Sequence, residues 1–190
     1  MADVTVTGTI DYGTQQQWAN RNVDAKNYVT QGGFNFLFMG CENAPASRCG
    51  GGSGIFPANT FDGTPTIAEK PYITYDGEKY LLNRPRYEIN KVGPTTDYDN
   101  AEQIDFSEVY VATEKDTAAT INAKLDAGLH LVLSPGTYNL DDTIKVNNAN
   151  TVVLGIGFAN LVSTTGKPCM IVGNVDGVRI AGILFQAGPV

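Results

Sequence analysis

The sequence predicts an all-β protein whose C-terminal part, residues 113–190, forms the first coils of a parallel β-helix. A single amphipathic helix is followed only by short segments rich in β-branched residues, the composition of strands. Leu131, Val152 and Val178 begin comparable segments about 21 to 26 residues apart, a repeat typical of a solenoid. In such a fold each strand stacks on its equivalent in the preceding coil, and aliphatic side chains fill the interior.

The helix is predicted over residues 113–128. An apolar stripe of helical period runs along this segment: Ala118, Ile121 and Leu125. Thr113, followed three residues later by Asp116, resembles an N-cap, and Gly128 suits a left-handed end. We expect this helix to cap the N-terminal end of the solenoid, because a bare coil would expose apolar side chains and unpaired backbone.

Six segments after the helix are predicted as strands: residues 130–134, 143–146, 151–155, 160–163, 169–172 and 178–185. Pro135 and Gly136 are expected to form a turn after the first of them. Residues 147–150 and 174–177 are rich in Asn, Asp and Gly, which tolerate positive φ, and they suit the corners of a coil. A β-sandwich with one edge helix is the alternative architecture.

Residues 1–112 lack this repeat and are expected to form an irregular β-rich region packed on the solenoid, not a separate domain. Four features are predicted within it: a strand at 4–10, a buried aromatic strand at 32–40, a long surface loop at 42–66 that includes the Gly-rich residues 49–54, and a hairpin at 71–82. Asp76 and Gly77 are expected to form the two-residue turn of the hairpin.

Composition excludes several classes of function. The 190 residues carry 13 Lys and Arg against 20 Asp and Glu, a formal net charge of −7. No cluster of basic residues is present to displace counterions from nucleic acid, so we expect no nucleic-acid partner. No apolar run approaches about 18 residues, so no membrane-spanning helix is expected. One His and three Cys offer little for a metal site or a Ser-His-Asp triad, and we expect neither a metal nor a cofactor.

Several motifs in order along the chain support a family resemblance. They are QQQWANRN (15–22), ENAPA (42–46), EKPYI (69–73), DTAATINAKLDAGLHLVLSPGTYNLDDTIKV (116–146), NTVVLGIGFANLV (150–162) and NVDGVRIAGILFQAG (174–188). The segment from residue 116 onward resembles the opening of pectate-lyase-like right-handed β-helix proteins. The whole set is similar to secreted microbial proteins related to family 55 glycoside hydrolases, some of which are labelled by a coagulation-factor 5/8-type domain or as adenylyl cyclases.

The resemblance implies an extracellular protein that acts on or holds polysaccharide of the β-1,3-glucan type. In the glucanase relatives the acidic catalytic residues lie further along the chain. We therefore expect these 190 residues to be the N-terminal portion of a longer, glycoside hydrolase-like protein, and not to be catalytic alone. Further coils or a neighbouring subunit would cover the open C-terminal end of the solenoid. The alternatives are a non-enzymatic β-helical adhesin or filament subunit, and a sugar-binding module.

Three carboxylates are the candidate catalytic residues, because a glycosidase needs two carboxyl groups roughly 5 to 10 Å apart. Asp141 and Asp142 are adjacent, so in an extended segment their side chains point to opposite faces. The competing interpretation is that both shape a turn. Asp176 precedes Gly177 at a predicted corner, where an Asx turn is the competing interpretation.

Two other groups of side chains carry predictions. Trp18, Tyr12 and Tyr28 are candidates for stacking on sugar rings, although aromatic side chains of this kind also fill small β cores. Cys41 and Cys49 lie close together in a predicted loop, where a disulfide would restrain the chain. Two residues have structural expectations: Cys169 is expected to be a buried free thiol, and His130 a packed residue at the start of the first coil strand, not a base.

Overall fold

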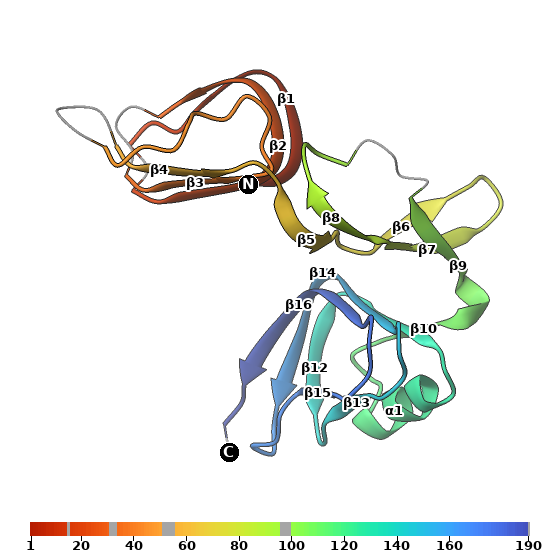
Figure 1. The fold of residues 1–190 in the computed structure, drawn as a ribbon. Coiled ribbons are helices and arrows are strands. Elements are labelled where there is room, and N and C mark those ends of the chain that lie inside the picture. The colour runs from red at the N-terminus through yellow and green to blue at the C-terminus, as the bar shows by residue number, and fades with distance from the viewer. Residues whose placement is uncertain (15, 31–33, 51–55, 96–99, 190) are drawn as a thin grey trace. The chain divides into compact units, whose positions relative to one another are not determined.

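The computed structural model describes residues 1–14, 16–30, 34–50, 56–95 and 100–189 (Figure 1). The chain divides into two compact units, one of residues 1–68 with 86–100 and the other of residues 69–85 with 101–190. The division expected from the sequence, 1–112 and 113–190, groups residues 69–85 and 101–112 differently. Most of the predicted Gly-rich stretch at 49–54 lies outside the described residues.

The first unit is built on four parallel strands. They are β1 (Ala2–Asp11), β2 (Trp18–Val29), β3 (Phe36–Met39) and β4 (Ala58–Phe61), paired in that order. Ala2 pairs with Arg21, Trp18 with Phe36, and Phe36 with Ala58, so paired residues lie 19, 18 and 22 positions apart. Irregular β structure was predicted here; the strands instead stack in parallel at near-regular spacing, as in a solenoid.

A buried polar network joins this sheet to an antiparallel pair, β5 (Thr64–Ala68) and β8 (Tyr87–Lys91). Asn22 on β2 is fully buried; its Nδ2 donates to the carbonyl oxygen of Lys91 at 3.0 Å, and its Oδ1 accepts from Thr64 Oγ1 at 2.9 Å. A Cβ on Gly40 would lie 2.4 Å from the same Lys91 oxygen. Only glycine therefore allows the chain to pass this close to β8.

The second unit contains the predicted parallel stack (Figure 1). Its strands β10 (Val109–Ala112), β11 (His130–Leu133), β14 (Val152–Ser163) and β16 (Arg179–Ala187) pair in parallel. Val109 pairs with His130, Leu131 with Val153, and Val153 with Ile180, so paired residues lie 21, 22 and 27 positions apart. The β-helix expected from the sequence is confirmed, and the sandwich alternative is wrong, because that fold needs antiparallel layers.

The coils continue through shorter strands on the other faces of the solenoid. β12 (Gly136–Leu140) pairs with the second half of β14, and β13 (Ile144–Val146) pairs with β15 (Met170–Val172). Inward residues fill the interior: Leu131, Leu133, Tyr138, Leu140, Ile144, Val146, Val153, Ala159 and Leu161. Two separate strands were predicted where β14 is continuous. Only a turn was predicted at Pro135-Gly136, where β12 begins.

A glycine corner explains how β14 bends without ending. A Cβ on Gly155 would lie 2.4 Å from the carbonyl oxygen of Gly182, and a Cβ on Gly182 would lie 2.1 Å from that of Gly155. The ladder between β14 and β16 shifts register at this point. Phe158 follows with a φ of 65° and is 94 % exposed, so the bulge turns its side chain away from the coil.

Helix α1 (Ala118–Asp126) buries the predicted stripe of Ala118, Ile121 and Leu125. Asn122 bonds to β13 as a neighbouring strand would: its Nδ2 donates to Thr143 O at 2.9 Å, and its Oδ1 accepts from Lys145 N at 2.7 Å. The helix is shorter than predicted, and its N-cap is Thr117, not Thr113. Asp116 instead fixes the approach to the helix by accepting from the backbone N of Thr113 at 2.8 Å.

A small antiparallel sheet covers one outer face of the solenoid. It consists of β6 (Tyr72–Tyr75), β7 (Tyr80–Pro85) and β9 (Ala101–Asp105), followed by the 3-10 turn η1 (Phe106–Glu108). Leu82 and Ile104 pack in one cluster with three outward residues of β11 and β14: Val132, Val152 and Leu154. The predicted hairpin is therefore present, but its loop spans residues 76–79 instead of two residues.

Candidate functional site

The two adjacent carboxylates at the end of β12 have structural partners. Asp141 Oδ1 accepts from Ala118 N, at the start of α1, at 3.4 Å. Asp142 Oδ1 accepts from the backbone N of Thr143 at 2.8 Å and pairs with Lys167 Nζ at 2.9 Å. The Lys167 ammonium, with this backbone hydrogen bond, lowers the pKa of Asp142. Both side chains hold turns of the first two coils together.

Asp176 lies at the predicted corner and is exposed. Its carbonyl oxygen accepts from the backbone N of Asn150 at 2.8 Å, which joins equivalent corners of two coils. A Cβ on the neighbouring Gly177, with a φ of 75°, would lie 2.1 Å from Asn150 Oδ1. The corner therefore depends on glycine and on stacked backbone. Among the described residues, no hydrogen bond links the Asp176 carboxylate to Asp141 or Asp142.

A glycosidase acid needs a raised pKa, so that it is protonated when it meets the substrate. Where the surroundings shift a carboxyl pKa in the described chain, the shift is downward. Backbone N–H donors lower the pKa of Asp76 and of Asp116, and Lys79 lowers that of Asp105. These carboxylates are held in the charged form, which suits turns and ion pairs better than proton donation.

The aromatic residues predicted to bind sugar lie in or against the core of the first unit. Tyr12 is 4 % exposed, and its ring centroid lies 5.3 Å from that of Trp18 and 5.2 Å from that of Phe36. Trp18 and Tyr28 are partly buried against the same cluster. Burial raises the pKa of Tyr28 to about 12. With neighbouring rings on it, Tyr12 has no open face for a pyranose, and the core interpretation fits it.

The three cysteines are free, and the predicted Cys41–Cys49 disulfide is not formed. Cys41 packs against the aromatic core of the first unit, and its Sγ lies 3.6 Å from the Met39 carbonyl oxygen. Cys49 is exposed. The two side chains thus occupy different environments although they are close in sequence. Cys169, expected to be buried, is only partly so; its Sγ donates to Leu161 O at 3.4 Å.

His130 has the structural role expected for it. Its Nδ1 accepts from the backbone N of Val152 at 3.0 Å, so the ring takes part in the contact between β11 and β14. Burial, and then the nearby Arg84, lower the pKa of His130. A neutral ring is what this hydrogen bond requires, because a protonated Nδ1 has no lone pair to accept with.

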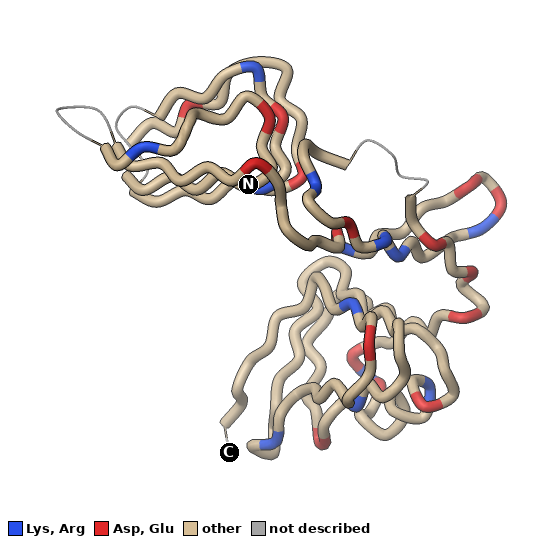
Figure 2. The backbone as a smooth tube through the Cα atoms, in the orientation of Figure 1, with Lys and Arg blue, Asp and Glu red and all other residues tan. Residues whose placement is uncertain are grey.

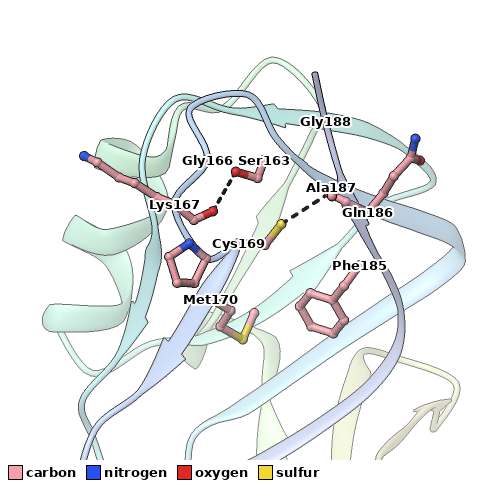
Figure 3. A pocket seen from close by; sticks show the side chains of 10 residues that line it. Ser163, Gly166, Lys167, Cys169, Met170, Phe185, Gln186, Ala187 and Gly188 are labelled. Carbon is pink, nitrogen blue, oxygen red and sulfur yellow. Dashed lines mark hydrogen bonds between the residues drawn. The ribbon is translucent and has the colours of Figure 1, made fainter. Parts of the chain in front are cut away.

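One open pocket of about 420 Å³ lies beside the last described coil, between the turn after β14 and β16 (Figure 3). Cys169, Met170 and Phe185 supply its apolar lining, and Lys167 and Gln186 its polar groups. Phe185 is 50 % exposed although its partner Leu161, one coil earlier, is fully buried. The pocket is thus part of an uncovered coil surface, and no described carboxylate lines it.

The β6–β7 hairpin carries a pair of exposed aromatic residues that were not among the candidates predicted from the sequence. Tyr75 and Tyr80 are directly paired across the two strands, and each is 58 % exposed. Their ring centroids are 5.0 Å apart, and the rings are inclined by 43°. Figure 2 shows acidic and basic residues gathered at the tip of this hairpin. The available signal was the position of the two residues, Tyr75 directly before the loop and Tyr80 directly after it, since one face of an antiparallel hairpin can stay solvated.

Parallel strands that stack in register at intervals of 21 to 27 residues define a parallel β-helix protein. Residues 109–190 match the LAM55 pectate lyase-like domain. Over its whole length the chain is 37 % identical to an exo-beta-1,3-glucanase from Streptomyces sp. (strain SirexAA-E / ActE), of which it covers 31 %. These matches confirm the predicted resemblance to pectate-lyase-like proteins related to family 55 glycoside hydrolases.

Two solved structures are similar to the whole chain. One is sacteLam55A from Streptomyces sp. SirexAA-E, with a TM-score of 0.86 and 36 % identity. The other is a variant of the same protein in complex with glucose, with a TM-score of 0.85 and 36 % identity. The chain covers 34 % of each, so it spans about a third of the length of the relatives it matches. Among the described residues, none of the helices has the length and apolar character of a membrane span.

Proposed function

We propose that this chain is the N-terminal part of an extracellular glycoside hydrolase-like protein that acts on β-1,3-glucan. The observation that carries the proposal is the similarity over the whole chain to an exo-beta-1,3-glucanase, at 37 % identity. The solved relative with bound glucose supports a polysaccharide or its product as the ligand of the longer protein. No part of this assignment rests on a catalytic residue within the 190 residues.

In this proposal the chain starts the solenoid on which the rest of the protein is built. Helix α1 caps the first coil, because Asn122 occupies the hydrogen-bonding positions that a preceding strand would use. The coils wind right-handed, the hand of nearly all parallel crossover connections. At the other end, Phe185 on β16 is 50 % exposed although its partner Leu161 is fully buried, and a following coil would bury it.

The catalytic acid and its partner carboxylate lie outside these residues. Asp141 and Asp142 are engaged in turn contacts, and the Asp142 carboxylate is held charged by Lys167. In this proposal these residues form the structural start of the solenoid, and later coils carry the catalytic residues. Polysaccharide is the proposed partner of the whole protein.

The first test compares two proteins on laminarin, a soluble β-1,3-glucan. A longer protein that begins with this sequence is expected to release glucose or short oligosaccharides, whereas residues 1–190 alone release none. Reducing-sugar assays measure both, and carboxymethylcellulose serves as the control β-1,4-glucan. Failure of the longer protein on every β-1,3-glucan would remove the proposal, and so would turnover by residues 1–190.

The uncovered coil surface also favours a second candidate function, a non-enzymatic β-helical subunit that stacks end to end. The exposed residues of β16 would then contact a second copy instead of a following coil. Light scattering after size exclusion is expected to give oligomers that resist dilution, and Phe185→Asp should dissociate them. A monomer at micromolar concentration excludes this candidate and leaves the glucanase proposal unaffected.

A further inference from the structure

Within the second unit, the hairpin formed by β6 and β7 carries an exposed aromatic surface. We call it the tyrosine face; it consists of Tyr75 and Tyr80, and Phe106 of η1, which is partly buried against the core, borders it beside Tyr80. Tyr80 contacts both other rings, with centroid distances of 5.0 Å to Tyr75 and 6.1 Å to Phe106. Tyr75 and Tyr80 leave more than half of their surface to solvent.

The tyrosine face is held by a rigid frame. The Asp76 carboxylate accepts from the backbone N of Glu78 at 2.8 Å and of Lys79 at 2.9 Å, which locks the loop between the strands. The hydroxyl of Tyr75 donates to the Gly77 carbonyl oxygen at 2.8 Å and so fixes its ring over the turn. These rings are therefore ordered before a ligand arrives, which lowers the entropy cost of binding.

Polar groups border the rings. Lys79 Nζ and Asp105 Oδ2 form an ion pair at 2.7 Å, and both side chains remain partly exposed. Asp105 also accepts from Ser107 N at 2.9 Å and thereby positions η1, which carries Phe106. An ammonium and a carboxylate of this kind keep free hydrogen-bonding capacity that sugar hydroxyls can use.

The size and composition of the tyrosine face favour a glycan over a protein partner. Two half-exposed tyrosines offer at most a few hundred Å², whereas a stable protein interface needs about 800 Å² on each side. The apolar face of a pyranose covers one aromatic ring, and its hydroxyls need bordering polar groups. The inclination of 43° between the two rings gives an angled surface, which suits a chain whose successive sugar rings are turned relative to each other.

We propose that the tyrosine face is a binding site for β-1,3-glucan, separate from the catalytic site of the longer protein. The choice of β-1,3-glucan as the ligand rests on the proposed function, and the existence of the site rests on the exposed rings. Such a site would hold the polysaccharide on the N-terminal part of the molecule while later coils act on it. It would bind a flat β-1,4-linked chain less well, because the two rings are not coplanar.

The test is binding by the 190-residue chain without any turnover. We expect laminarin in a native gel to retard the chain, and laminarihexaose to bind in calorimetry more tightly than cellohexaose. Tyr80→Ala removes the central ring and is expected to raise the Kd for laminarihexaose about tenfold. Tyr80→Trp keeps an aromatic surface and should retain binding. Because hydrolysis is not measured, a failure here is distinguishable from a failure of the glucanase proposal.

Tyr87→Ala is the matched control, because Tyr87 is 60 % exposed but lies on β8 in the other unit. It should leave binding unchanged. Thermal unfolding of each variant distinguishes lost binding from lost structure, and Tyr80→Trp provides a second test if the alanine variant does not fold. An absence of retardation in the unmodified chain, an equal loss with Tyr87→Ala, or equal affinity for cellohexaose would overturn the proposal.

Discussion

Leu161→Ala is expected to lower the free energy of unfolding of the second unit by about 2–5 kcal/mol. Leu161 on β14 is fully buried and belongs to the cluster that fills the solenoid. It pairs with Tyr138 on β12 and with Phe185 on β16, so its side chain lies in the interior column between two coils. Removing it leaves a cavity that backbone pairing on both sides prevents from closing. Urea unfolding followed by circular dichroism measures the change.

Leu184→Ala is the matched control for this variant. Leu184 is on β16, next to the partner of Leu161, but it is 60 % exposed. Its truncation is expected to change the free energy of unfolding by less than about 0.5 kcal/mol. Similar losses for the two leucines would contradict the inward column, and with it the assignment of interior and exterior residues along the coils.

Phe38→Ala is expected to destabilise the first unit by about 3–5 kcal/mol. Phe38 on β3 is fully buried, and its ring meets that of Tyr28 edge-on at 5.2 Å and also packs near Tyr12 and Phe36. The substitution removes a fully buried ring from the aromatic core. Hydrogen exchange with mass spectrometry should show it as reduced protection in residues 1–68, where this core lies.

Phe61→Ala is the matched control. It tests whether the loss of stability comes from removing a buried ring and not from removing any phenylalanine of this sheet. Phe61 ends β4 in the same sheet and is 53 % exposed. Protection of the first unit should remain close to that of the unmodified chain. If Phe38→Ala left exchange in residues 1–68 unchanged, the first unit would not have the core that its parallel strands enclose.

The C-terminal coils were largely predictable because their pattern repeats. Runs of β-branched residues at near-constant spacing predicted the parallel stack, and the stripe on α1 predicted its buried side. The stack in the first unit was not predicted, although paired residues there lie 18 to 22 positions apart. Its strands differ from one another in residue type: β1 is rich in Thr, β2 carries buried Asn, and β3 is aromatic. These strands therefore stack in register although their sequences share no pattern.

For the candidate site residues, the sequence did not show which side chains are buried. Tyr12 directly follows β1 and Tyr80 begins β7; they are the same residue type, yet one is 4 % exposed and the other 58 %. Sequence reasoning assigned sugar stacking to the buried one. Asp142 similarly gained its role from Lys167, which lies in the next coil, 25 residues away. Contacts of this range arise from the closure of a coil and cannot be read from neighbouring residues.

The sequence by itself determined that the C-terminal part forms stacked parallel strands and where most strands of the second unit lie. It also determined which family the chain resembles. These follow from periodic burial, because a coil repeats the same environment at a fixed spacing. Only the tertiary structure decided which aromatic rings are buried, that the cysteines are not paired, and which carboxylates are held in turns. Those outcomes depend on the register between strands, and a shift of one residue would exchange every inward side chain for an outward one.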